Sequence, residues 1–178
     1  MALKQLQAFW TEHRSLLLFL GTALLLYVIW YILYELWLHP QGHLDHAVID
    51  NTIWAATGLL KALGYGVAAE GRIIAIEGTE GLYIGDPCNG VDLFALFSGF
   101  ILAFPGPWQH KLWYLPVGIL AIHLLNILRV VALSLILVYA PMTLEFNHTY
   151  TFTFLVYGFI FLGWIVFANR FGLLRLKK

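Results

Sequence analysis

The sequence predicts an all-α integral membrane protein with about four transmembrane helices, together with an outer amphipathic helix and a short β-hairpin before the second span. Of its 178 residues, 61% are hydrophobic and 11% are charged, and the mean hydropathy is +0.79. A soluble domain of this length cannot bury so much apolar surface. The sequence contains no internal repeat and no linker-like tract, so residues 1–178 are expected to form a single membrane domain.

The first span is predicted over residues 15–38, an apolar run of 24 residues that is interrupted only by Glu35. At about 1.5 Å per residue, a helix of this length crosses roughly 30 Å of hydrocarbon. The residues after it, His39 to His43, offer no small-residue cleavage site. A cleavable signal peptide has a shorter apolar core that ends at such a site, so we expect an uncleaved helix.

The outer loop, residues 39–87, is predicted to contain an amphipathic helix and a hairpin. Helical spacing over Leu44–Leu63 defines an apolar stripe, and Gly64 is suited to end the helix. The stripe consists of Leu44, Val48, Thr52, Ala56, Leu59, Leu60 and Leu63, and Asp45, Asp50, Asn51 and Lys61 lie off it. Residues 72–77 and 81–85 then flank Gly78-Thr79-Glu80, a pattern typical of two short strands joined by a turn.

The remaining spans are predicted over residues 88–104, 112–139 and 151–168, with an inner turn at residues 105–108 and an outer loop at residues 140–150. The segment after Cys88 is short enough to dip into the bilayer and return, but the distribution of charge favours a crossing. With a crossing, one side carries Lys4, Arg14, Lys111, Arg170, Arg175, Lys177 and Lys178, and the other carries Asp45, Asp50, Glu70, Glu77, Glu80, Asp86 and Glu145. The positive-inside bias then places both termini in the cytoplasm.

Cys88, the only cysteine, stands where a polar loop turns into the second span. A single thiol forms no internal disulfide, so Cys88 is either inert packing or a reactive group. A helix N-terminus favours a thiolate, because free N–H groups and the helix dipole stabilise negative charge. Asn89 and Gly90 follow, and a small residue beside a nucleophile lets a substrate backbone come close. Spacing alone favours the inert alternative.

Arg129 lies inside the third span, roughly 15 Å from its outer end. A buried arginine costs at least about 2.5 kcal/mol on insertion scales, so it is expected to face the helix bundle and to have a partner. His123, Asn126 and Arg129 recur every three residues and therefore share one flank of the helix. They form either a structural polar stripe, in which Arg129 pairs with Glu35 or Asp92, or a site where Arg129 meets a substrate.

His148 precedes the fourth span, where it is either an interfacial residue that caps the helix start or a proton acceptor. By the predicted topology, Cys88, Arg129 and His148 all lie in the outer half of the membrane. A thiol, an imidazole and a guanidinium suffice for acyl transfer. In such a site the thiolate attacks a carbonyl, the histidine moves the proton and the arginine steadies the oxyanion.

Signals for other kinds of site are weaker. His39, His43 and His46 have helix-like spacing, but Pro40 and Gly42 disfavour a regular helix there, and no HExxH or CxxC motif accompanies them. We therefore predict no metal site. The chain also has no Walker, GxGxxG or GxSxG motif and no basic nucleic-acid patch, so we predict no cofactor and no nucleic-acid partner.

A known family shares three features of this chain in the same order. The Cys-Asn-Gly triplet at residues 88–90, the Asn-x-x-Arg pattern at residues 126–129 and His148 resemble the exosortase and archaeosortase family of membrane transpeptidases. The resemblance covers roughly residues 82–158, and larger family members have more predicted spans, so the chain is similar to the short bacterial forms. It implies the nucleophile Cys88, completed by Arg129 and His148 and supported by Asn89, Gly90 and Asn126.

The function that the resemblance implies is that of an exosortase-like cysteine protease and transpeptidase at the outer face of the cell inner (cytoplasmic) membrane. Its substrates would be exported proteins whose C-terminus carries a short motif, a transmembrane helix and a basic tail. The enzyme would cleave near the motif, beside membrane lipid, and transfer the protein to an acceptor. The alternative is a non-catalytic membrane subunit that assembles or anchors a surface polysaccharide exporter, with Arg129 and Asn126 serving helix packing.

Overall fold

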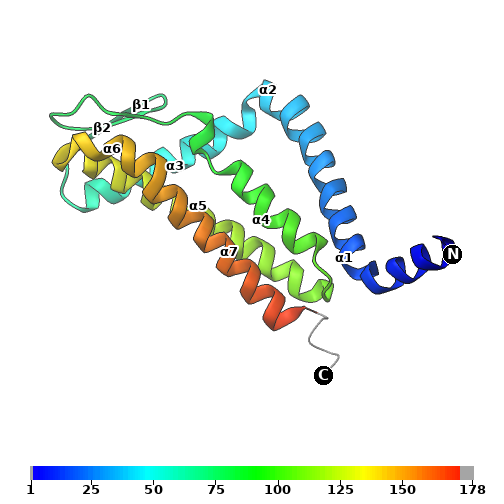
Figure 1. Ribbon diagram of the computed structural model, residues 1–178. Helices are drawn as coiled ribbons and strands as arrows, with labels where there is room; N and C mark the ends of the chain where they lie inside the picture. The colour runs from blue at the N-terminus through cyan, green and yellow to red at the C-terminus, as the bar shows by residue number, and fades with distance from the viewer. Residues whose placement is uncertain (1, 173–178) are drawn as a thin grey trace.

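The computed structural model describes residues 2–172, with side chains from His13 onward, and it is mostly helical (Figure 1). In this part of the chain, three helical stretches are long and apolar enough to cross a membrane: His13–Gln41, Trp108–Tyr139 and Pro141–Phe171. The apolar helix α4 (Val91–Ala103) is shorter, at 13 residues. The predicted all-α membrane fold is thus confirmed, but only three of the expected spans have full spanning length, and α4 is shorter.

The first span is a continuous helical stretch made of α1 (Ala2–Trp30), the π-helical segment η1 (Tyr31–Leu38) and the single turn α2 (His39–Gln41). It packs closely against the other helices in two places. Phe19, near the middle of α1, makes edge-on ring contacts with Phe100 and Phe104, and Tyr34 of η1 is buried. Between these two places an apolar groove of about 570 Å³ separates the first span from α4.

Helix α3 (His43–Ala62) is the predicted amphipathic helix, and Gly64, with φ +91, follows its end as expected. Its buried face differs from the predicted stripe: it consists of Asp45, Ile49, Thr52, Ile53, Ala56 and Leu60, whereas Leu44, Leu59 and Leu63 are exposed. The prediction that Asp45 lies off the buried face was wrong. Hydrogen bonds to its carboxylate, described below, allow this charged group to be buried.

The predicted hairpin is present, and an additional strand extends it into a three-stranded antiparallel sheet. Strands β2 (Ile73–Ile76) and β3 (Leu82–Tyr83) pair as expected, and β1 (Val67–Glu70) pairs with the other edge of β2, in the order β1-β2-β3. The sequence pattern did not indicate β1, because two alanines and a glutamate make up most of this strand.

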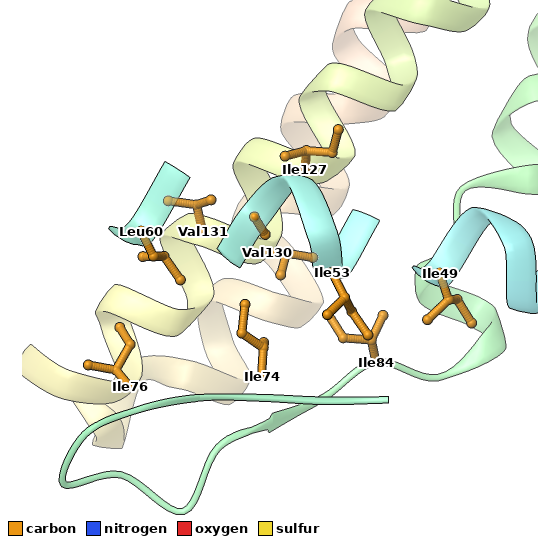
Figure 2. Packing of buried hydrophobic residues seen from close by; sticks show 10 residues of the cluster. Ile49, Ile53, Leu60, Ile74, Ile76, Ile84, Ile127, Val130 and Val131 are labelled. Atoms are coloured by element: carbon orange, nitrogen blue, oxygen red, sulfur yellow. The ribbon is translucent and has the colours of Figure 1, made fainter. Parts of the chain in front are cut away.

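The sheet covers the ends of α3 and of α5 (Trp108–Tyr139), and the three elements enclose one of two hydrophobic cores. Figure 2 shows the packed side chains of this core, which are Ile49, Ile53, Ala56, Leu60, Ile74, Ile76, Ile84, Ile127, Val130 and Val131. Cys88 packs against the edge of this core. The sheet therefore holds the loop that carries the thiol against the helices.

The second core joins α4, α5 and α7 (Phe152–Phe171) and consists of Phe97, Ile101, Ile122, Val156, Ile160 and Phe167. A hydrogen bond of 2.8 Å from the Tyr114 hydroxyl to the Gly163 main-chain oxygen also ties α5 to α7. Figure 1 shows these three helices side by side, with α1 on the other side of α4 and inclined to it. The expected turn between α4 and α5 is present at residues 104–107.

Two predicted boundaries need correction. Helix α4 begins at Val91 and not at Cys88, because Cys88 ends a separate 3₁₀ turn, η2 (Asp86–Cys88). The expected outer loop at residues 140–150 is largely helical, and is made of η3 (Pro141–Thr143), α6 (Leu144–Phe146) and the π-helical turn η4 (Asn147–Thr151). These short segments continue into α7, so His148 belongs to a helix and not to a loop.

Candidate active site

Cys88 is held in a tight turn between strand β3 and helix α4. Pro87 lies within the 3₁₀ turn η2, and the main-chain N–H of Cys88 donates to the oxygen of Gly85 at 2.9 Å. Gly90 then adopts φ +83 and redirects the chain into α4. A side chain at Gly90 would be strained in this left-handed conformation. Gly90 is itself buried, and its backbone conformation accounts for a glycine here. The expected close approach of a substrate backbone stays a prediction.

The His148 side chain, which belongs to η4, lies beside the Cys88 thiol. Its Nε2 atom lies 3.4 Å from Cys88 Sγ, within hydrogen-bonding distance for sulfur, although the residues are 60 positions apart in sequence. Both side chains are partly buried and line a cavity of about 30 Å³. A cavity of this size has room for roughly two water molecules, so only a small part of a substrate can enter it.

Arg129 lines the same cavity and is the third side chain that the sequence places there. Its Nε atom is buried and has no hydrogen-bond partner among the described residues. The expected pairing of Arg129 with Glu35 or Asp92 is not found, because the ion pairs among the described residues are His39–Asp45 and Arg72–Asp86. A buried N–H group without a partner costs free energy, so Arg129 is suited to bind an oxygen atom that enters the cavity.

The three polar residues on this flank of α5, His123, Asn126 and Arg129, have different surroundings. His123 Nε2 lies 2.7 Å from Asn51 Oδ1 on α3. One turn further on, the Asn126 side-chain amide donates to the main-chain oxygens of Cys88, at 2.8 Å, and of Asn89, at 3.2 Å. Asn126 therefore fastens the Cys88 turn to α5, and the third member, Arg129, is left facing the cavity.

The Asn89 side chain is buried and connects the Cys88 turn to Asp45 on α3, which in turn contacts the first span. Its Oδ1 atom accepts a hydrogen bond of 2.8 Å from the Val91 N–H at the start of α4. Its amide nitrogen donates to the carboxylate of Asp45, which is only 1% exposed. Tyr34 donates to the same carboxylate at 2.7 Å, and His39 Nδ1 lies 3.1 Å from it.

The charge on Asp45 is stabilised by these contacts. Burial acts to raise the pKa of Asp45, but the hydrogen bonds from Tyr34 and His39 outweigh it, so the pKa lies below its usual value. Sequence reasoning missed Tyr34 and Asp45. Asp45 shares a helical face with Ile49, Thr52 and Ile53, and a charged residue in such an apolar row was the signal for a buried polar contact.

The three histidines considered as metal ligands have different surroundings. His39 faces Asp45, His46 lies 3.4 Å from the Arg72 guanidinium, and His43 is exposed. Within residues 2–172, no three histidine, cysteine, aspartate or glutamate side chains come together in a way that could hold a metal ion.

A comparison with known protein families identifies the family of the chain. A model described as transmembrane exosortase matches residues 4–174. The chain belongs to the transmembrane exosortase family. No curated protein and no solved structure matches the chain. In this exosortase, Cys88, Arg129 and His148, which come from a loop, a span and a helical turn, line one cavity beside the membrane helices.

Proposed function

We propose that this exosortase is a membrane cysteine protease and transpeptidase, with Cys88 as nucleophile, His148 as general base and acid, and Arg129 as oxyanion ligand. The distance of 3.4 Å between Cys88 Sγ and His148 Nε2, in a cavity that Arg129 also lines, carries this proposal. A nucleophile within hydrogen-bonding distance of a proton acceptor, with a cation beside both, is the arrangement that acyl transfer requires.

The first half-reaction makes a thioester. His148 accepts the proton of the Cys88 thiol, and the sulfur forms a bond to the carbonyl carbon of the scissile peptide. The carbonyl oxygen becomes an oxyanion, for which Arg129 Nε is an available donor. When the C–N bond breaks, the amine of the C-terminal fragment leaves with the proton held on His148.

The second half-reaction releases the thioester. An incoming amine of an acceptor, or water, attacks the carbonyl carbon while His148 accepts its proton. The C–S bond breaks and His148 returns the proton to the Cys88 sulfur, so that the enzyme is regenerated. Transfer and hydrolysis differ only in the group that attacks.

The substrate we propose is an exported protein that carries a C-terminal motif, a transmembrane helix and a basic tail. The charge distribution supports an active site on the outer face of the cytoplasmic membrane, because the expected topology assigns seven of the ten basic residues to one side of the spans and seven of the ten acidic residues to the other. The substrate helix then lies in the bilayer beside α4 and α5, with its juxtamembrane segment at Cys88.

The test is co-expression of the exosortase with a tagged protein that carries such a C-terminus, followed by mass spectrometry of the product. The wild type is expected to yield a shortened protein with an acceptor or a free carboxylate at its new end. Cys88→Ala, Arg129→Ala and His148→Ala are each expected to abolish processing. His43→Ala is the matched control, because His43 is exposed. Unchanged processing by the Cys88→Ala protein would refute the proposal.

A further inference from the structure

Strand β3 is the edge strand of the sheet and lies directly beside the candidate active site. On one side it pairs with β2, and in the described part of the chain no strand pairs with its other side. Leu82, Tyr83 and Ile84 line the same cavity as Cys88 and His148. The free edge of the sheet is therefore continuous with the site.

The register shows which main-chain groups point toward this free edge. The Ile84 N–H donates to the Arg72 oxygen at 2.8 Å, and Tyr83 stands opposite Ile73. In an antiparallel pair, hydrogen-bonded and non-hydrogen-bonded positions alternate. Ile84 therefore belongs to a bonded position, and the N–H and C=O groups of Tyr83 point away from β2.

A strand with unpaired N–H and C=O groups can bind another extended chain. Peptides use such edges by adding a strand, and the main-chain hydrogen bonds then fix the direction and position of the peptide. Charged or proline residues, which commonly protect an edge, are absent from β3, and the side chain of Tyr83 is 63% exposed. The complementary partner is an extended polypeptide, since it carries donors and acceptors at the matching spacing.

The segment between this edge and the thiol is firmly held. Arg72 Nη1 forms an ion pair of 2.7 Å with Asp86 Oδ1 in η2, and the Arg72 main-chain oxygen accepts from Ile84. The Gly85 oxygen accepts from the Cys88 N–H. A chain bound to Tyr83 would thus have a fixed position relative to Cys88 Sγ.

We infer that the juxtamembrane segment of the substrate binds as an extended strand along the free edge of β3, with hydrogen bonds to the main chain of Tyr83. This inference rests on the proposed function, because it assigns the binding mode of the same substrate. The edge positions the scissile carbonyl at the thiol, and Tyr83 acts through its backbone and not through its side chain.

The first experiment compares Tyr83→Pro with Tyr83→Ala in the substrate-processing assay. Both variants lose the phenol, but only proline removes the outward N–H, which the sheet does not use. We expect Tyr83→Pro to process the substrate roughly tenfold more slowly than Tyr83→Ala, as expected for the loss of one hydrogen bond. Equal rates for the two variants would overturn the inference.

The second experiment tests strand addition with the wild-type enzyme, and is needed if the Tyr83→Pro protein does not fold or express. Proline is placed in turn at each position of the tagged substrate around its cleavage site, and the wild-type enzyme is used. Strand addition predicts a position where proline blocks processing, flanked by positions where it is tolerated. Uniform sensitivity or uniform tolerance contradicts it. If the wild type leaves the unmodified substrate intact, the proposed function fails, which is a result separate from either outcome.

Discussion

The side-chain amide of Asn126 donates hydrogen bonds to the main-chain oxygens of Cys88 and Asn89, at 2.8 and 3.2 Å. It thereby joins the middle of α5 to the turn that carries the thiol. Asn126→Ala removes both bonds, and we expect a loss of roughly 1–3 kcal/mol of stability and a larger relative loss of processing, because the position of Cys88 Sγ is no longer fixed. Thermal unfolding in detergent and the substrate assay measure the two effects.

Ser134→Ala is the matched control for Asn126→Ala. Ser134 is also buried on α5, but its hydroxyl donates to the Val130 oxygen of its own helix, at 2.9 Å. We expect Ser134→Ala to retain processing. Equal activity of the two variants would show that the Asn126 contacts do not position the thiol.

Cys88 should react with iodoacetamide more slowly once His148 is removed. His148 Nε2 is the proton acceptor 3.4 Å from the thiol, so His148→Ala is expected to lower the alkylation rate at pH 7 by at least roughly tenfold. His43→Ala should leave the rate unchanged. Mass spectrometry of the intact protein over time gives both rates, and a similar rate in all three proteins would indicate that the thiol does not depend on His148.

The buried carboxylate of Asp45 should make stability depend on pH. Its pKa is lower in the folded than in the unfolded protein, so its ionised form stabilises the fold above the unfolded pKa, about 3.9. This contribution is lost as the pH falls through the folded pKa. We expect the unfolding temperature of the wild type to exceed that of Asp45→Asn at pH 7, and the difference to shrink below about pH 4.

The control for this measurement is Asp50→Asn, because Asp50 lies on the same helix but is exposed. Its substitution should give a curve close to that of the wild type. A constant difference between wild type and Asp45→Asn from pH 7 to pH 3 would mean that the Asp45 charge does not stabilise the fold.

Gly118 provides the contact between α5 and α4 that leaves least room for substitution. A Cβ atom there would lie 2.2 Å from the ring of Phe97, which is buried in the second core. Gly118→Ala should therefore displace the ring and cost roughly 1–3 kcal/mol. Gly158→Ala, on α7, has no atom within 4 Å of the new Cβ and should not be destabilising. Similar unfolding temperatures for the two variants would contradict this packing.

The overall fold was predictable from the sequence, because the spans follow from the length of apolar runs and the placement of charge, α3 from helical periodicity and the β2–β3 hairpin from its turn residues. One cavity is lined by Cys88, Arg129 and His148. This agrees with the topology inferred from charge, because that topology assigned all three residues to one half of the membrane. Their distances were not predictable, since a short loop and two helices from separate parts of the chain set them. The catalytic roles of these side chains stay predictions.

The buried contacts of Asp45 and Tyr34, which hold the Cys88 turn through Asn89, were less predictable than the candidate catalytic residues. Asp45 looked like a solvated charge because the apolar stripe of α3 was assigned one position too early, with Leu44 in place of Asp45. The Tyr34 hydroxyl lies in a mostly apolar run, and its partner is 11 residues away in sequence. Local pattern cannot indicate such a contact, because it depends on how the first span meets α3.

The short length of α4 has a consequence for where a peptide bond can be cut. Its 13 residues rise about 20 Å, whereas the hydrocarbon layer is about 30 Å thick. If the α4–α5 turn lies at one membrane surface, the thiol is recessed from the other, and the surrounding lipid has to thin to let water reach it. The length of α4 then sets the distance between the substrate's transmembrane helix and the peptide bond that is cut. Membranes of different thickness would shift that distance.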